Sequence, residues 1–88
     1  MEQVCYSGIL VKTEEEPDRL SLAMVPAGTP EKRWDDPMAQ HIFHVGEETR
    51  FAFSPEELRP GMALVIGYNG IATRSLPPQS VALFVLKG

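Results

Sequence analysis

Six short segments of this sequence are rich in β-forming residues, and charged residues, prolines or glycines separate each one from the next. The segments are residues 4–12, 20–25, 41–45, 49–53, 62–68 and 81–87. Their lengths, five to nine residues, are those of ordinary strands. We therefore predict an all-β fold.

The first two segments indicate a hairpin in which one strand is bent. Leu20, Leu22 and Met24 alternate with smaller residues, which is the pattern of a strand with one face in a core. Gly8 interrupts the first segment at a place where a bulge or a sharp bend is favoured. We expect a kinked first strand that takes part in two sheets at once.

Residues 54–61 carry the signals of a short helix. Ser54 is a good N-cap, Pro55 suits the first helical position, and Glu57 completes a capping box. Gly61 then acts as a stop signal. One helical turn, or little more, fits this length.

The order of these elements predicts one small barrel. Five or six strands with a single short helix before the penultimate strand are the plan of an OB-like Greek-key barrel. The length of 88 residues suits one domain, and 43% of hydrophobic residues is enough for a single core. We expect this domain to comprise residues 1–88.

A long loop, residues 26–40, joins the second and third predicted strands and contains three prolines. Loops of this length are uncommon inside compact domains and often have a function. Trp34, next to Arg33, is the most conspicuous side chain in the loop. Two roles stay open for it: it folds the loop back onto the barrel, or it faces a ligand.

The residues that most often carry metal or catalytic chemistry are few here. His41 and His44, three apart on a predicted strand, point to opposite faces and do not chelate one ion together. Cys5 is the single cysteine, so it forms no internal disulfide, and no histidine lies near it in the sequence. We therefore predict no metal site, no cofactor and no enzymatic activity.

Charge is distributed unevenly along the chain. All twelve acidic residues lie within positions 1–57, which carry a net charge of −7, whereas positions 58–88 carry +3. The overall charge of −4 has the wrong sign for a protein that binds by neutralising phosphates. Single-stranded nucleic-acid binding, with aromatic side chains as stacking platforms and Arg33, Arg50 and Arg74 as phosphate contacts, is the weaker alternative.

The stretch "GYNGIATRSLPPQS", residues 67–80, lies between the last two predicted strands. Asn69 and Gly70 form a strong tight-turn pair, and the two adjacent prolines favour an extended segment that donates no hydrogen bonds to a sheet. We interpret the stretch as a connector. Turn geometry leaves Arg74 and Gln79 unexplained.

OB-like barrels bind ligands through one face of the sheet and the loops around it. Polar and aromatic residues of the long loop and of the connector are therefore the candidates for a binding site. These residues are Arg33, Trp34, Tyr68, Asn69, Arg74 and Gln79.

Residues 54–88 contain a longer pattern: a short helix, a strand, a connector with tyrosine, glycine and S-x-P-P-Q, and a final strand that begins near an alanine. The residues of the pattern are Leu58, Gly61, Tyr68, Gly70, Ile71, Ser75, Pro77, Pro78, Gln79 and Ala82. The pattern resembles the YobA-like domain, a family of uncharacterised small extracytoplasmic domains of Gram-positive bacteria. This chain departs from it at Arg74, where an acidic residue is common. The resemblance implies an OB-like barrel outside the cytoplasm, and it implies no activity.

Together these observations predict a non-enzymatic binding or accessory module of the bacterial cell envelope, with an unidentified protein or envelope component as its ligand. The chain has no apolar run of 18 residues, and its start, "MEQVC", lacks the features of a signal peptide, so a cytoplasmic location stays open. A structural role is the remaining alternative. In it, the apolar strand predicted at 81–87 pairs with a copy of itself to form a homodimer.

Overall fold

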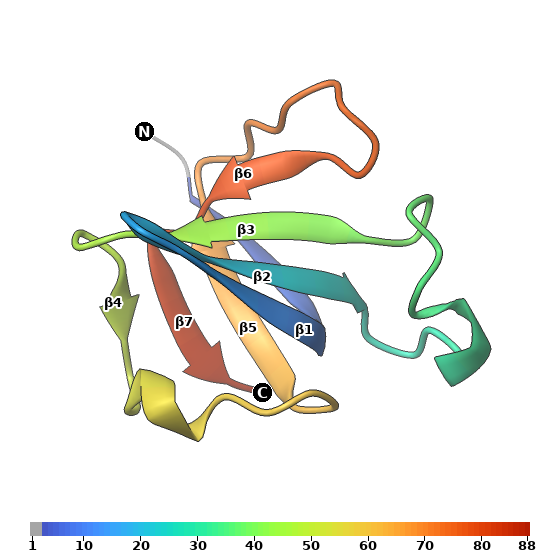
Figure 1. Cartoon of the computed structure of the whole chain (residues 1–88), viewed down its shortest axis with the longest axis horizontal. Helices are drawn as coiled ribbons and strands as arrows, with labels where there is room; N and C mark the ends of the chain where they lie inside the picture. The colour runs from blue at the N-terminus through green and yellow to red at the C-terminus, as the bar shows by residue number, and fades with distance from the viewer. Residues whose placement is uncertain (1–2) are drawn as a thin grey trace.

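Seven strands form one mixed sheet in the computed structural model, which describes residues 3–88 (Figure 1). The strands are β1 (Val4–Glu16), β2 (Arg19–Pro26), β3 (His41–Val45), β4 (Arg50–Phe51), β5 (Ala63–Tyr68), β6 (Gln79–Val81) and β7 (Phe84–Lys87). Two short 3-10 helices, η1 (Glu31–Arg33) and η2 (Pro55–Glu57), are the helical elements of the described part. The all-β prediction is therefore confirmed. Met1 and Glu2, which belong to the start compared above with a signal peptide, lie outside the described residues.

The order of the strands in the sheet is β4-β7-β5-β1-β2-β3-β6. Neighbouring strands are antiparallel except for two parallel pairs, β3 with β6 and β4 with β7. We predicted five or six strands, and residues 3–88 form seven. The difference arises at the end of the chain, where two short strands, β6 and β7, pair with β3 and β5 respectively. The first of them, β6, begins at Gln79, inside the stretch that we interpreted as a connector.

Two backbone hydrogen bonds bridge the break between β6 and β7. The Ala82 amide donates to the His44 carbonyl at 2.9 Å, and the Leu83 amide donates to the Gly67 carbonyl at 2.7 Å. The chain therefore stays hydrogen-bonded as it changes its partner from β3 to β5.

The first strand pairs with both β2 and β5, but these strands all belong to one sheet, so the prediction that it takes part in two sheets is not confirmed. Gly8 and Ile9 have partners in both β2 and β5. A Cβ atom at Gly8 would overlap the carbonyl oxygen of Val25, so only glycine fits where the two backbones approach this closely.

A register shift between Leu10 and Lys12 turns the second half of β1 over. Leu10 is buried in the core opposite Met24, and in an unbroken strand the even-numbered residues after it would face the core as well. The extra residue at position 11 reverses the alternation, so that Lys12 lies opposite Ala23 on the outer face.

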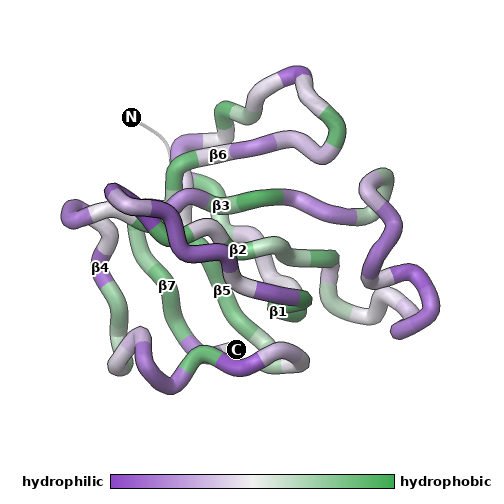
Figure 2. Tube along the Cα trace, viewed as in Figure 1, coloured by the Kyte–Doolittle hydropathy of each residue, from purple (hydrophilic) through white to green (hydrophobic). Residues whose placement is uncertain are grey.

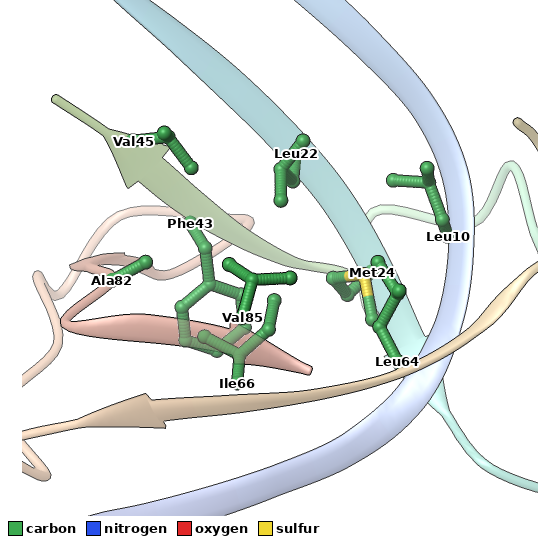
Figure 3. Close-up of a cluster of buried hydrophobic side chains, with 9 residues drawn as sticks. All are labelled: Leu10, Leu22, Met24, Phe43, Val45, Leu64, Ile66, Ala82 and Val85. Carbon is green, nitrogen blue, oxygen red and sulfur yellow. The ribbon is translucent and has the colours of Figure 1, made fainter. Parts of the chain in front are cut away.

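The core is a cluster of buried apolar side chains on one face of the sheet (Figure 3). Its members are Leu10, Leu22, Met24, Phe43, Val45, Leu64, Ile66, Ala82 and Val85. Strands β2, β3 and β5 each contribute residues two positions apart, as alternation requires. Ala23 on β2 and His44 on β3, which lie between these core residues, therefore belong to the opposite, outer face of the sheet.

The predicted short helix is η2, a single 3-10 turn. Its capping box is present: the Ser54 amide donates to the Glu57 carboxylate at 3.2 Å, and the Ser54 hydroxyl oxygen accepts from the Glu56 amide at 3.4 Å. Pro55 occupies the first position, as predicted. The turn leads into β5.

Candidate functional site

A groove of about 360 Å³ lies on the outer face of β1, β2 and β3 and reaches the first residue of β6. The residues that line it are Lys12, Glu14, Glu16, Arg19, Ser21, Ala23, Gln40, Ile42, His44, Pro77 and Gln79. Hydrophilic residues occupy the second half of β1 and the turn into β2, as Figure 2 shows. The groove is therefore polar on one side, and it has a volume within the usual range for a small-molecule site.

Small side chains on β2 form the floor of this groove. Ser21 and Ala23 are only 7% and 3% exposed, and longer side chains flank them on both neighbouring strands. The register places Glu14 and His44 on either side of Ser21. A row of short residues between rows of long ones leaves a hollow, and this is the origin of the groove.

The register shift in β1 supplies the charged wall. Because the shift turns Lys12 outward, Glu14 and Glu16 face outward as well. Lys12 lies 3.7 Å from Glu14, and Arg19 lies 3.3 Å from Glu16. Both ion pairs are substantially exposed, so each is worth at most about 1 kcal/mol and opens readily.

A continuous chain of hydrogen bonds crosses the groove from β1 to β6. The Ser21 hydroxyl donates to Glu16 Oε1 at 3.1 Å and lies 3.0 Å from His44 Nδ1. On the other side of the ring, His44 Nε2 lies 2.7 Å from Gln79 Oε1. Both ring nitrogens of His44 are therefore occupied, and the imidazole holds the Gln79 side chain in place.

Two amide side chains are oriented at the same end of the groove. The carbonyl oxygen of Gln79 bonds to His44, so its amide nitrogen is left to donate elsewhere. Gln40 has the reverse arrangement, because its amide nitrogen donates to the Trp34 carbonyl at 2.6 Å and its carbonyl oxygen is left to accept. Among residues 3–88, one donor and one acceptor without a partner thus lie in the same lining.

The histidines lie on opposite faces of β3, as their spacing predicted. His41 faces inward, and its ring stacks on Phe43 with the ring centroids 4.3 Å apart. Burial lowers the pKa of His41 below its ordinary value of 6.5. Within residues 3–88, no group of three histidine, cysteine or carboxylate side chains is placed to hold a metal ion.

A second, smaller cleft of about 260 Å³ lies between β6 and the chain that follows β5. Asn69, Ile71, Thr73 and Val81 are among the residues that line it. Ile71 and Val81 are 70% and 63% exposed, so this cleft is open and largely apolar. Gln79 lines both the groove and the cleft.

The six predicted site residues are only partly brought together. Gln79 lines the groove, and Asn69 joins it only in the second cleft. Asn69 forms the predicted turn, with its side-chain oxygen accepting from the Ile71 amide at 3.0 Å and Gly70 at a φ of 83°. Tyr68 is half-buried beside the core, with its ring against Phe43.

The residues predicted on the long loop are held by the loop itself. Trp34 donates its indole N–H to the Thr29 carbonyl at 3.0 Å, which favours the structural role for this side chain. Arg33 pairs with Asp36 at 3.2 Å. Arg74 is exposed and lines neither hollow. Of the two residues that turn geometry left unexplained, Gln79 therefore has a place in the groove.

Most of the groove was missed by sequence reasoning. Ser21 and His44 are adjacent only because β2 and β3 pair in one particular register, which the sequence does not state. One signal was available: the alternation in "LSLAMV" places a serine and an alanine on the outer face, where small residues favour a hollow. The charged wall had no comparable signal, because the register shift in β1 reverses its alternation.

No family model matches this chain, and no curated protein is significantly similar to it. The resemblance of residues 54–88 to the YobA-like family therefore stays a prediction. None of the helices in the described residues is long and apolar enough to cross a membrane.

Proposed function

We propose that this protein is a non-enzymatic binding or accessory module whose outer-face groove holds a small polar ligand. One observation carries the proposal: the groove has a buried floor of small residues and a side-chain network that fixes Gln79 at its edge. Unused hydrogen-bonding groups on a preorganised wall are what a ligand site provides. A surface formed only by folding has no need of such an arrangement.

The proposed fold is an OB-like Greek-key barrel. Support comes from the link between β6, which pairs with β3, and β7, which pairs with β5. The two linking residues, Ala82 and Leu83, donate hydrogen bonds to His44 and Gly67, so the chain joins the two sides of the sheet. The position of η2 before β5 and the double pairing of β1 also agree with that plan. In this fold, the outer face of the second and third strands is a usual place for binding.

A binding role fits the chemistry of the groove better than catalysis. Ser21 lies 3.0 Å from His44, the geometry of a nucleophile beside a base. However, Glu16 and His44 compete for the single proton of the Ser21 hydroxyl, and Ser21 is only 7% exposed on the floor of the groove. The hydroxyl is therefore poorly placed to attack a substrate.

The nucleic-acid alternative has no phenylalanine, tyrosine or tryptophan ring in the groove on which bases could stack. Among the described residues His44 supplies the one ring in the lining, and stacking on aromatic rings supplies much of the affinity for single strands. Arg33, one of the predicted phosphate contacts, is paired with Asp36. A fluorescent oligonucleotide that binds tightly at low salt would restore this alternative.

The homodimer alternative is restricted by the pairing of the last strand. Phe84 and Val85 have β5 on one edge and β4 on the other, so a second copy has no free edge there unless β4 moves. Light scattering over a range of concentrations tests this, and we expect a monomer.

The proposed location is the cell envelope, and its support is the resemblance of residues 54–88 to an extracytoplasmic family. Fractionation of native cells with intact mass measurement tests this point. Recovery of an unprocessed 9.8 kDa product from the cytosol would overturn the location and leave the binding role standing.

The binding role is tested by nuclear magnetic resonance with ¹⁵N-labelled protein and a panel of sugars, amino acids, short peptides and nucleotides. We expect at least one class to shift backbone amides of β2 and β3 around Ser21 and His44. If every class leaves these amides unchanged at millimolar concentration, the proposed function is wrong.

A further inference from the structure

The two long walls of the groove have different chemistry. The wall on β1 and β2 carries two cations and two carboxylates, which sum to no net charge. The opposite wall carries Ile42, His44, Pro77 and Gln79, with no formally charged carboxylate or ammonium group. Such a groove favours a ligand that carries both signs of charge and has no net charge itself.

The charges on β1 are spaced along the strand. Lys12 is two residues from Glu14 and four from Glu16, and a strand rises about 3.3 Å per residue. The rows of Lys12 and Glu14 are therefore about 7 Å apart. The charged atoms themselves lie 3.7 Å apart in the ion pair, so Lys12 and Glu14 must separate before the ends of a two-residue chain, at most about 7 Å apart, pair with them.

The two free amide groups lie in the same lining as Lys12. Gln79 has a donor to offer and Gln40 an acceptor, because His44 and the Trp34 carbonyl occupy the other half of each amide. A peptide bond presents one carbonyl oxygen and one N–H group, the complement of this pair. A sugar would need no such pairing, and among residues 3–88 the lining offers it no phenylalanine, tyrosine or tryptophan ring for stacking.

We propose that the groove binds a short zwitterionic peptide of dipeptide size. Its carboxylate lies toward Lys12, its ammonium group toward Glu14 and Glu16, and its peptide group faces the opposite wall, where Gln40 and Gln79 lie. Ile42 and Pro77 provide the apolar wall for a small side chain. This inference rests on the proposed function, because it names the ligand class of the same groove.

The two histidines make the test selective. A ¹H–¹³C spectrum of the imidazoles contains two signals, because the chain has two histidines. His44 is in the groove, whereas His41 is on the inner face against Phe43 and serves as an internal control. A ligand in the groove shifts the His44 signal and leaves the His41 signal in place.

The probe is the dipeptide L-alanyl-L-alanine. The comparison ligands are its N-acetylated form, which lacks the ammonium group, and its C-amidated form, which lacks the carboxylate. With about eleven heavy atoms the unblocked dipeptide should bind with a dissociation constant on the order of 1 mM. We expect each blocked form to bind about tenfold more weakly, because each loses one charge-assisted contact. Equal binding of the three forms would overturn the zwitterion assignment.

Variants locate the two ends of the peptide. Lys12→Met and Glu16→Gln should each weaken the binding of the dipeptide about three- to tenfold. Lys32→Met and Glu47→Gln, at exposed positions outside the groove, are the matched controls and should leave the affinity unchanged. A loss of affinity as large in the controls as in the groove variants would contradict the proposed site.

Maltose and a short thymidine oligonucleotide are tested as ligands of other classes. Their results distinguish a failure of the peptide assignment from a failure of the proposed binding function. If either shifts the His44 signal while the dipeptide does not, the peptide assignment is wrong and the groove remains a binding site. If none of the probes shifts the His44 signal, the ligand class is wrong, and the broader amide panel decides the proposed function separately.

Discussion

Tyr6 has a buried hydroxyl group without a hydrogen-bond partner among residues 3–88. Its ring belongs to an aromatic cluster with Phe43 and His41, at centroid distances of 5.1 and 5.4 Å. Burial, together with the nearby Tyr68, raises the pKa of Tyr6 to about 12. The ring stabilises the core, whereas the unpaired hydroxyl opposes folding.

We expect Tyr6→Phe to keep the ring and to raise the free energy of unfolding at pH 7 by up to about 1 kcal/mol. In the unchanged protein the folded state keeps this proton up to about pH 12, whereas the unfolded state loses it near 10. Stability is therefore lost as the pH rises through this interval, and the variant should lose less. Urea denaturation at pH 7, 9 and 11 measures both effects. A less stable variant at pH 7 would indicate that the hydroxyl has a partner.

For single residues, the sequence predicted turns and helix caps better than it predicted contacts between residues that are distant in the chain. Asn69 and Ser54 form the turn and the cap that their residue types favour, because the partners of such groups lie within a few residues. Ser21 and His44 are far apart in the chain, so only the register of β2 and β3 could reveal their contact.

Among the elements, β1 determines the shape of the molecule. Gly8 lets it bend close to β2 and pair with β5, and the register shift after Leu10 turns its charged half outward. The sequence predicted the bend from Gly8, but no residue type marks the shift. The divided last strand was missed for a related reason, since "VALFVLK" reads as one continuous strand.

Gly8→Ala should destabilise the protein by about 1–3 kcal/mol, because the added Cβ meets the backbone carbonyl of Val25, which cannot rotate away. Gly46→Ala is the matched control: a Cβ there meets nothing within 4 Å. The control should change stability by less than about 0.5 kcal/mol or increase it slightly. Urea denaturation of both variants decides between a specific backbone contact and a general effect of replacing glycine. Equal changes would contradict the contact.

For the whole molecule, three groups make the folded state prefer neutral over acid pH. Burial lowers the pKa of His41. The Met38 amide, and then Arg33, lowers the pKa of Asp36, and Lys87 lowers that of Glu57 with a hydrogen bond of 2.9 Å. In each case the unfolded state binds more protons than the folded state as the pH falls, so acid destabilises the protein.

The contribution of His41 can be separated from that of the carboxylates by its position on the pH scale. The unfolded chain begins to protonate this histidine near pH 6.5, whereas Asp36 and Glu57 have ordinary values of 3.8 and 4.5. His41→Phe keeps an aromatic ring beside Phe43 and removes the titrating group. We expect the variant to lose the fall in stability just below pH 6.5 and to keep the fall below about pH 4.5. Thermal unfolding from pH 2.5 to pH 8 measures both intervals. An unchanged profile above pH 5 would mean that His41 is protonated as easily in the folded state as in the unfolded chain.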